Sequence, residues 1–90
     1  MAIEIGKRVS RELREYIETF TTPDERKQIM LQYPFGRSAA TQALNGYDTL
    51  SKSTHPLILD YIKLAMQNRT LKMKTLSKVH NEVTQYAKHI

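Results

Sequence analysis

The chain contains no cysteine, no tryptophan and no long run of apolar residues. Without cysteine there are no disulfides and no thiolate metal ligands, so a chain of 90 residues must be stabilised by helix packing or by a second chain. The N-terminal sequence MAIEIGKRVSRELREY lacks the apolar stretch of a signal peptide or a membrane span. We therefore expect a small cytoplasmic protein without a membrane anchor.

The residue types that support catalysis or metal binding are also scarce. His55, His80 and His89 are scattered and have few carboxylates near them in sequence, which argues against a metal site. There is no glycine-rich phosphate loop, and the glutamates of residues 12–18 alternate with arginines at the spacing of ion pairs on a helix surface. We expect neither a cofactor nor catalytic residues, and therefore no enzyme.

Acidic residues are few, and the resulting net charge of +5 favours an anionic partner. Residues 1–23 are neutral, residues 24–55 carry a net charge of +1, and residues 56–90 carry +4. A solvated helix face and a stripe that contacts phosphates explain this last excess equally well. Its bases are Lys63, Arg69, Lys72, Lys74, Lys78 and Lys88.

Apolar residues at spacings of three and four predict amphipathic helices along much of the chain. The first helix covers about residues 4–19. The pattern Thr22-Pro23-Asp24-Glu25 is typical of a capping box with proline in the first turn, so a second helix starts at Asp24. It stops at Tyr33, because the following proline disfavours helical geometry there. The inward residues of the first helix are Val9, Leu13, Tyr16, Ile17 and Phe20.

A short helix, a loop and a longer helix are predicted next. Residues 37–44 form a helix rich in small side chains, which Asn45-Gly46 ends because both residues tolerate the left-handed conformation. Residues 47–55 are polar and form a loop that Leu50 anchors in the core. Pro56 then opens the central helix of the core. Its apolar face contains Leu57, Ile58, Tyr61, Ile62, Ala65 and Met66.

A separate terminal helix is predicted from Thr70 onward, where neither glycine nor proline occurs. It packs back on its own domain or pairs with the same helix of a second chain, and we favour pairing because the domain is small. The expected fold is all-α: a compact bundle of about five helices in residues 1–68, followed by a basic amphipathic helix in residues 69–90. The apolar seam available for dimerisation consists of Leu76, Val79, Val83, Tyr86 and Ile90.

Residues 24–46 contain the parts of a helix-turn-helix. Such a motif needs two short helices, a tight turn, an apolar anchor in that turn, and a second helix with one apolar and one polar side. The parts are Ile29 and Met30 on the first helix, Phe35 in the turn, and Ala40 with Leu44 on the inner side of the second helix.

The segment IMLQYPFGRSAATQALNG resembles the lambda-repressor-like helix-turn-helix proteins, including the lac repressor type. Phe35 falls at the apolar position of the turn, Ala40 at the buried position of the recognition helix, and residues 53–65 resemble the helix that follows. The likeness covers about residues 22–67 and departs from the family pattern at Met30, Pro34 and Gly36. It implies sequence-specific binding of duplex DNA by a small transcriptional regulator. The small size of the chain favours a regulator of the kind that phages and mobile elements encode.

The outward side of the predicted recognition helix follows from Ala40 and Leu44, which fix the inward side. Arg37 matches the O6 and N7 atoms of guanine, and Gln42 matches N6 and N7 of adenine. An ordinary exposed cation at a helix start is the alternative for Arg37. The predicted base-contacting residues are Arg37, Ser38, Thr41 and Gln42.

Contacts to DNA phosphates fix the position of a protein without carrying sequence information. Backbone amides at the start of the second helix are suited to this role. Tyr47 follows Gly46, and we expect it to be a partly buried loop aromatic, with a hydroxyl contact to phosphate as the alternative. The basic residues predicted to contact phosphates are Lys27, Lys52, Arg69, Lys72 and Lys74.

The main alternative is a helical protein-interaction module or inhibitor that does not bind DNA. The terminal seam and the weak basicity of residues 24–46 favour it. A membrane-surface role ranks third, because the terminal helix is cationic and amphipathic but lacks a broad face of Trp, Phe and Leu. The expected partners are therefore double-stranded DNA and a second copy of the chain.

Overall fold

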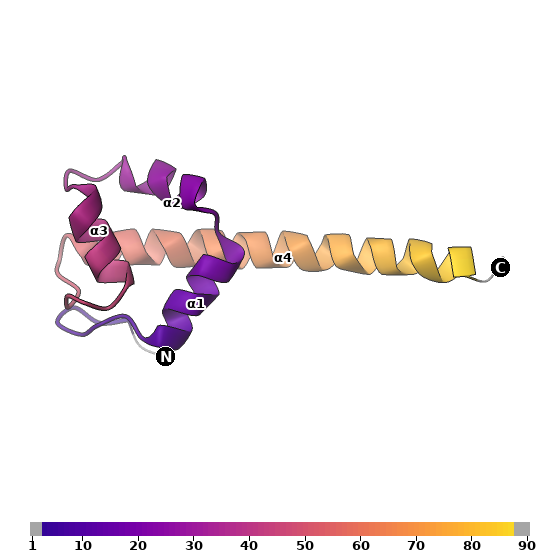
Figure 1. Ribbon diagram of the computed structural model, residues 1–90, viewed down its shortest axis with the longest axis horizontal. Helices are drawn as coiled ribbons and strands as arrows, with labels where there is room; N and C mark the ends of the chain where they lie inside the picture. The colour runs from indigo at the N-terminus through magenta and orange to yellow at the C-terminus, as the bar shows by residue number, and fades with distance from the viewer. Residues whose placement is uncertain (1–2, 88–90) are drawn as a thin grey trace.

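The computed structural model describes residues 3–87, which form four α-helices and no strand. α1, α2 and α3 each pack chiefly against α4, whose second half projects away from them (Figure 1). The all-helical class is confirmed, but the expectation of five helices is wrong. The helices are α1 Arg11–Phe20, α2 Pro23–Met30, α3 Arg37–Leu44 and α4 Thr54–Ala87.

The fifth helix is missing because the predicted central and terminal helices are one helix of 34 residues. No glycine or proline follows Pro56, so nothing in the backbone interrupts it. α4 begins at Thr54, two residues before Pro56. The N–H of Ser51 donates to Oγ1 of Thr54 at 2.8 Å, and the N–H of Thr54 donates to Oγ of Ser51 at 3.2 Å.

Burial divides the chain into two parts, which we call the head (residues 3–68) and the stalk (residues 69–87). Every described residue after Asn68 is exposed. The molecule measures 57 × 26 × 15 Å with a radius of gyration of 17.1 Å, whereas a compact chain of this length has a radius of about 12 Å. The chain as a whole is therefore elongated, because the stalk extends from the head. The compact bundle was expected for residues 1–68 only, and the helices of the head do pack around one core.

The core of the head lies between α1, α3 and the first turns of α4. Leu50 is buried there, as expected. Met66 was expected inside but is 57 % exposed, because it lies at the edge of a groove between α1 and α4. The buried apolar residues are Val9, Leu13, Ile17, Ala40, Ala43, Leu44, Leu50, Leu57, Ile58, Tyr61 and Ala65.

α1 begins at Arg11, seven residues later than predicted. The side chain of Ser10 caps it by accepting a hydrogen bond from the N–H of Leu13 at 3.2 Å. The residues before it run beside the loop that follows α3, because Gly6 donates its N–H to the carbonyl of Leu50 at 2.7 Å. Gly6 has a φ of 88°, which no right-handed helix contains.

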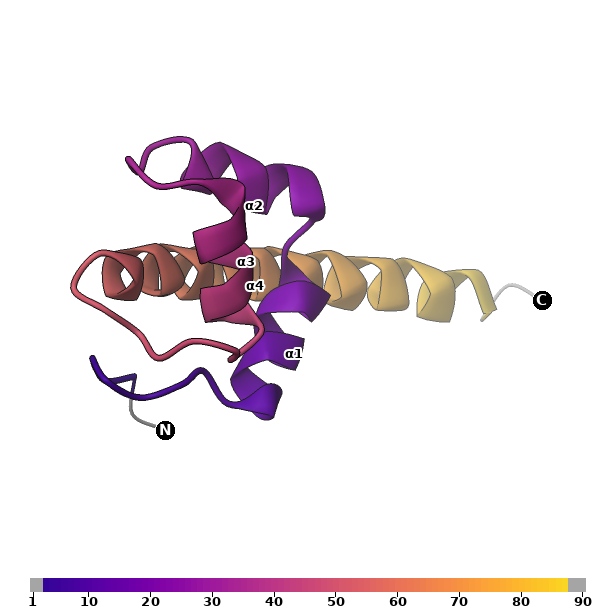
Figure 2. The ribbon, with the colours of Figure 1, turned by 60° about the vertical axis from the view of Figure 1, so that its left-hand side comes forward.

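The connection between α2 and α3 is longer than the sequence indicated. α2 ends at Met30, and the chain continues to Tyr33 in tighter turns, with hydrogen bonds of the i to i+3 type. Residues 31–36 therefore connect the two helices, whereas a helix-turn-helix has a turn of about three to four residues. α2 and α3 both pack chiefly on α4 (Figure 2), so a helix-turn-helix arrangement is not confirmed.

Candidate nucleic-acid interface

α3 separates buried small side chains from exposed polar ones. Ala40, Ala43 and Leu44 are buried against the core, as the spacing of Ala40 and Leu44 predicts. The polar side chains on its other side are all exposed, and α3 contains no acidic residue. We call this surface the α3 face, and it consists of Arg37, Ser38, Thr41 and Gln42.

Tyr47 adds an aromatic ring to the α3 face. It is 69 % exposed, so the expectation of a partly buried loop aromatic is wrong. The cause is the end of α3: Gly46 has a φ of 75°, its N–H donates to the carbonyl of Ala43, and the N–H of Tyr47 donates to that of Gln42 at 3.0 Å. This pair of bonds is a Schellman motif, and it brings the residue after glycine back beside the helix.

Tyr47 and the four residues of the α3 face line a shallow depression of about 300 Å³. The Asn45-Gly46 signal in the sequence predicted the end of α3 correctly. The same signal also specifies the Schellman bonds that place Tyr47 beside Gln42, so this neighbour was predictable. The site therefore has one cation, two hydroxyls, one amide and one phenol, which are side-chain types able to hydrogen-bond to base edges or phosphates.

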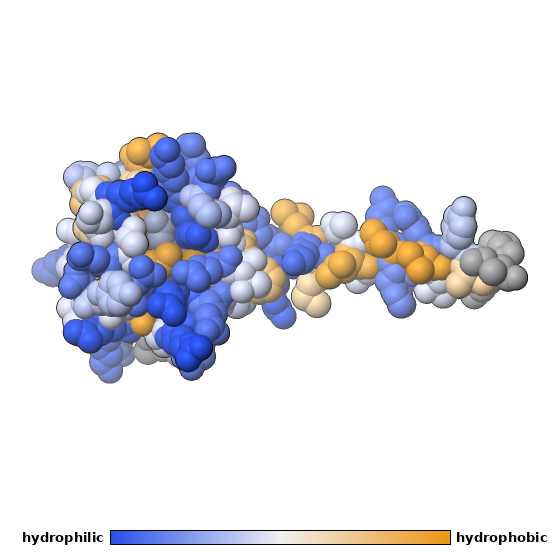
Figure 3. Space-filling view, viewed as in Figure 1, coloured by the Kyte–Doolittle hydropathy of each residue, from blue (hydrophilic) through white to orange (hydrophobic). Residues whose placement is uncertain are grey.

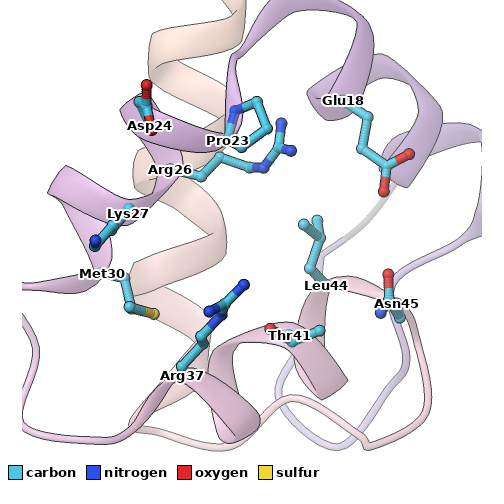
Figure 4. Close-up of a pocket in the computed structure, with 10 residues that line it drawn as sticks. All are labelled: Glu18, Pro23, Asp24, Arg26, Lys27, Met30, Arg37, Thr41, Leu44 and Asn45. Atoms are coloured by element: carbon cyan, nitrogen blue, oxygen red, sulfur yellow. The ribbon is translucent and has the colours of Figure 1, made fainter.

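A second concavity, which we call the hollow, separates α3 from α2 and has a volume of about 420 Å³ (Figure 4). Arg37 and Thr41 line both the hollow and the depression, so they form the ridge between them. Arg26 and Lys27 enter the hollow from α2. Figure 4 shows the side chain of Arg37 extending from α3 toward α2. The acidic residues that line the hollow are Glu18 and Asp24.

The N-terminus of α3 has no side-chain cap. Gly36 occupies the N-cap position and is exposed. The first N–H groups of a helix have no acceptor within the helix and carry a partial positive charge. The start of α3 therefore supplies backbone donors next to Arg37 and Ser38.

The position of α2 is fixed at both of its ends. At its start, the amide of Asn68 on α4 donates to the carbonyl of Phe20 at 2.8 Å and to the carboxylate of Glu25. The N–H of Thr22, and then Asn68, hold the pKa of Glu25 below its ordinary value near 4.5. This carboxylate therefore stays ionised and keeps the junction between α1 and α2 on α4.

At the other end of α2, the hydroxyl of Tyr33 donates to the carboxylate of Asp60 on α4. Burial, followed by this hydrogen bond, raises the pKa of Tyr33 to about 12. The phenol therefore stays protonated at neutral pH and remains a donor. Phe35 packs against Tyr33 with ring centroids 5.6 Å apart, and both rings pack against the core. Phe35 thus anchors the connection, as the sequence predicted.

The predicted phosphate contacts lie in three places. Lys27 shares the hollow with Arg37, and Lys52 is exposed in the loop before α4. The others lie on the stalk; Lys72, for example, is about 17 Å along α4 from the core residue Tyr61. The structure does not bring these stalk residues to the α3 face. They are Arg69, Lys72 and Lys74.

The described part of the predicted dimerisation seam is exposed. The stalk projects from the head, so the alternative that it packs back on its own domain is wrong. Ile90 lies outside the described residues. The exposed fractions are 58 % for Leu76, 47 % for Val79, 60 % for Val83 and 77 % for Tyr86.

Within residues 3–87, no group of three or more His, Asp or Glu side chains is placed to hold a metal ion. In the same range, no helix combines the length and apolar character needed to cross a bilayer. Comparisons of the chain with protein-family models, with curated proteins and with solved structures gave no match.

Proposed function

We propose that the α3 face binds duplex DNA, with α3 lying in the major groove. The observation that carries this proposal is the polar side of α3, where Arg37, Ser38, Thr41 and Gln42 are all exposed on a helix whose other side is buried. An α-helix with its side chains is about 10–12 Å in diameter. It therefore fits into a major groove that is about 12 Å wide.

The surroundings of the α3 face also suit a polyanion. The uncapped start of α3 offers backbone N–H groups for a phosphate. Lys27 adds a cation across the hollow, and Tyr47 adds a hydroxyl at the far end of the depression. The proposed roles are therefore base contacts from Arg37 and Gln42 and phosphate contacts from the side chains that flank them.

We expect Arg37→Ala and Gln42→Ala each to weaken binding at a preferred site by about 1–3 kcal/mol, because each removes a bidentate contact to a base. The preferred duplex is first selected from a random pool. Fluorescence anisotropy then compares its affinity with that of a scrambled duplex, for which little change is expected.

Lys63→Ala is the matched control for Arg37→Ala. Lys63 is exposed on the side of α4 opposite the core, and its substitution removes the same charge. Equal losses on preferred and scrambled duplexes would exclude base contacts by α3. A complete lack of binding to random duplexes at micromolar protein and low salt would reject DNA binding and favour the protein-interaction module.

The salt dependence of binding tests the proposed phosphate contacts. Lys27→Ala should weaken binding to every duplex alike and reduce the slope of log K against log salt by about 1, because one fewer counterion is released. Lys74→Ala should reduce the slope by the same amount only if the bound DNA extends as far as the stalk and contacts Lys74. Titrations between about 50 and 200 mM salt measure both slopes, and an unchanged slope for Lys27→Ala would place the DNA away from the hollow.

A further inference from the structure

The stalk is a helix that no other element of residues 3–87 covers. All of its residues are exposed, and Figure 3 shows apolar side chains along its length. Leu76, Val79, Val83 and Tyr86 follow one another at spacings of three and four, so they lie along one side of the helix. This stripe covers more than half of the stalk.

A lone helix of this kind is only marginally stable in water. The stalk has 19 residues, about 28 Å of helix. Neither of the two ion pairs found in residues 3–87 lies in it. Isolated helices gain little from propensity alone and are stabilised mainly by packing of their apolar side. Its β-branched residues, which lower helix propensity, are Thr70, Thr75, Val79, Val83 and Thr84.

We propose that the stalk pairs with the stalk of a second copy in antiparallel orientation. Its charges decide the orientation, because the stalk has four bases and a single acid, Glu82. The heptad register of the stripe continues backward from Leu76 to Lys72 and Arg69. A parallel pair would stack Lys72 on Lys72 and Arg69 on Arg69, which places like charges together at the interface.

Antiparallel pairing removes both like-charge layers. Leu76 then packs on Val79 of the second copy, and Lys72 lies against Val83, beside the carboxylate of Glu82. Arg69 meets the ring of Tyr86, a favourable cation–π arrangement. Each of these layers occurs twice by symmetry, so six layers join the two stalks. The long stems of Lys72 and Arg69 cover apolar surface while their charged ends reach solvent.

This arrangement extends beyond DNA binding by a single head, because it sets the distance between two heads. In the antiparallel pair, Tyr61 of one copy and Tyr61 of the other are about 50 Å apart along the helix axis. Tyr61 lies in the part of α4 that packs against α3, so this distance approximates the separation of the two α3 faces. Successive major grooves on one side of a duplex are about 34 Å apart. The pair therefore holds its two α3 faces too far apart for adjacent grooves and presents two separate binding surfaces.

Cysteine cross-linking tests the orientation in the full chain, which has no cysteine of its own. Lys72→Cys and Val83→Cys proteins are prepared separately, mixed and oxidised. We expect a disulfide-linked dimer that contains one copy of each variant. Neither variant should cross-link with itself, because each position is about 16 Å along the axis from its counterpart in the antiparallel pair, beyond the reach of a disulfide.

Ser77→Cys is the control, because Ser77 lies away from the stripe and should not cross-link with Val83→Cys. Self-linked dimers of Lys72→Cys and of Val83→Cys would overturn the antiparallel orientation. Absence of every cross-link, together with a monomeric mass by sedimentation equilibrium, would overturn pairing itself.

A second measurement separates pairing from folding. Leu76→Glu/Val79→Glu should raise the dimer dissociation constant at least tenfold, whereas Ser77→Glu/Asn81→Glu adds the same charges on the other side of the stalk and should change it little. The free energy of unfolding of the head, measured by urea titration and tyrosine fluorescence, is expected to stay unchanged in both variants, because the substituted residues lie in the stalk. Equal dissociation constants for the two variants would reject the stripe as the interface. The result does not depend on DNA, so failure of the proposed DNA binding leaves it intact.

Discussion

Leu57→Ala is expected to lower the free energy of unfolding of the head by about 2–5 kcal/mol. Leu57 is fully buried on α4, the helix against which α1, α2 and α3 each pack. Removing its side chain leaves a cavity in the hydrophobic core of the head. Small domains have unfolding free energies of only about 5–15 kcal/mol, so this loss is a large fraction of the total.

Urea titration followed by tyrosine fluorescence measures the loss, because Tyr61 lies in the same core. Leu71→Ala is the control: it makes the same substitution on the same helix, but Leu71 is exposed in the stalk. Its effect should stay within about 0.5 kcal/mol. Similar losses for the two variants would mean that α4 does not stabilise the head through Leu57.

The sequence predicted elements where the signals were local. Thr22 and Glu25 form both bonds of the capping box at the start of α2, and α3 spans the residues that the small side chains indicated. Boundaries set by distant contacts were missed. α1 starts late because the N–H of Gly6 donates to the carbonyl of Leu50. Tyr33 lies outside the regular helix, where Pro34 follows it and the carboxylate of Asp60 accepts a hydrogen bond from its hydroxyl.

The continuity of α4 was missed for a physical reason as well. The sequence prediction placed the start of a separate terminal helix at Thr70, where the polar residues Asn68, Arg69 and Thr70 interrupt the apolar pattern. In the structure Asn68 binds the junction between α1 and α2, and the helix passes from the head into solvent at that residue. The apolar pattern changes at Asn68 because α4 passes there from the core of the head into solvent, while its helical backbone is uninterrupted.

Only the residues of the α3 face could be predicted from the sequence; the position of the stalk bases relative to it could not. The spacing of Ala40 and Leu44 predicted which side chains of α3 face outward, because helix geometry fixes that relation. The distance of Arg69, Lys72 and Lys74 from α3 depends on the direction in which α4 leaves the head. No local pattern contains that direction, so their separation from the α3 face could not be predicted.

Gly46→Ala is expected to lower the free energy of unfolding by about 2–3 kcal/mol. Gly46 has a φ of 75°, and a Cβ there would lie 2.8 Å from the carbonyl oxygen of Val9. The added methyl group must therefore displace backbone, in a conformation that is already unfavourable for alanine. The same shift breaks the bond from Tyr47 to Gln42, so the α3 face also loses its aromatic neighbour.

Gly36→Ala is the matched control at the other end of α3. Gly36 has a φ of -77°, and a Cβ there meets no atom within 4 Å. Alanine is a poorer N-cap residue than glycine, which destabilises the helix, but it also reduces the conformational entropy of the unfolded chain, which stabilises the protein. Because the two effects oppose each other, the free energy of unfolding should change by no more than about 1 kcal/mol. Thermal and urea denaturation of both variants measure the difference. A Gly46→Ala protein as stable as Gly36→Ala would show that α3 does not end in the left-handed turn that places Tyr47.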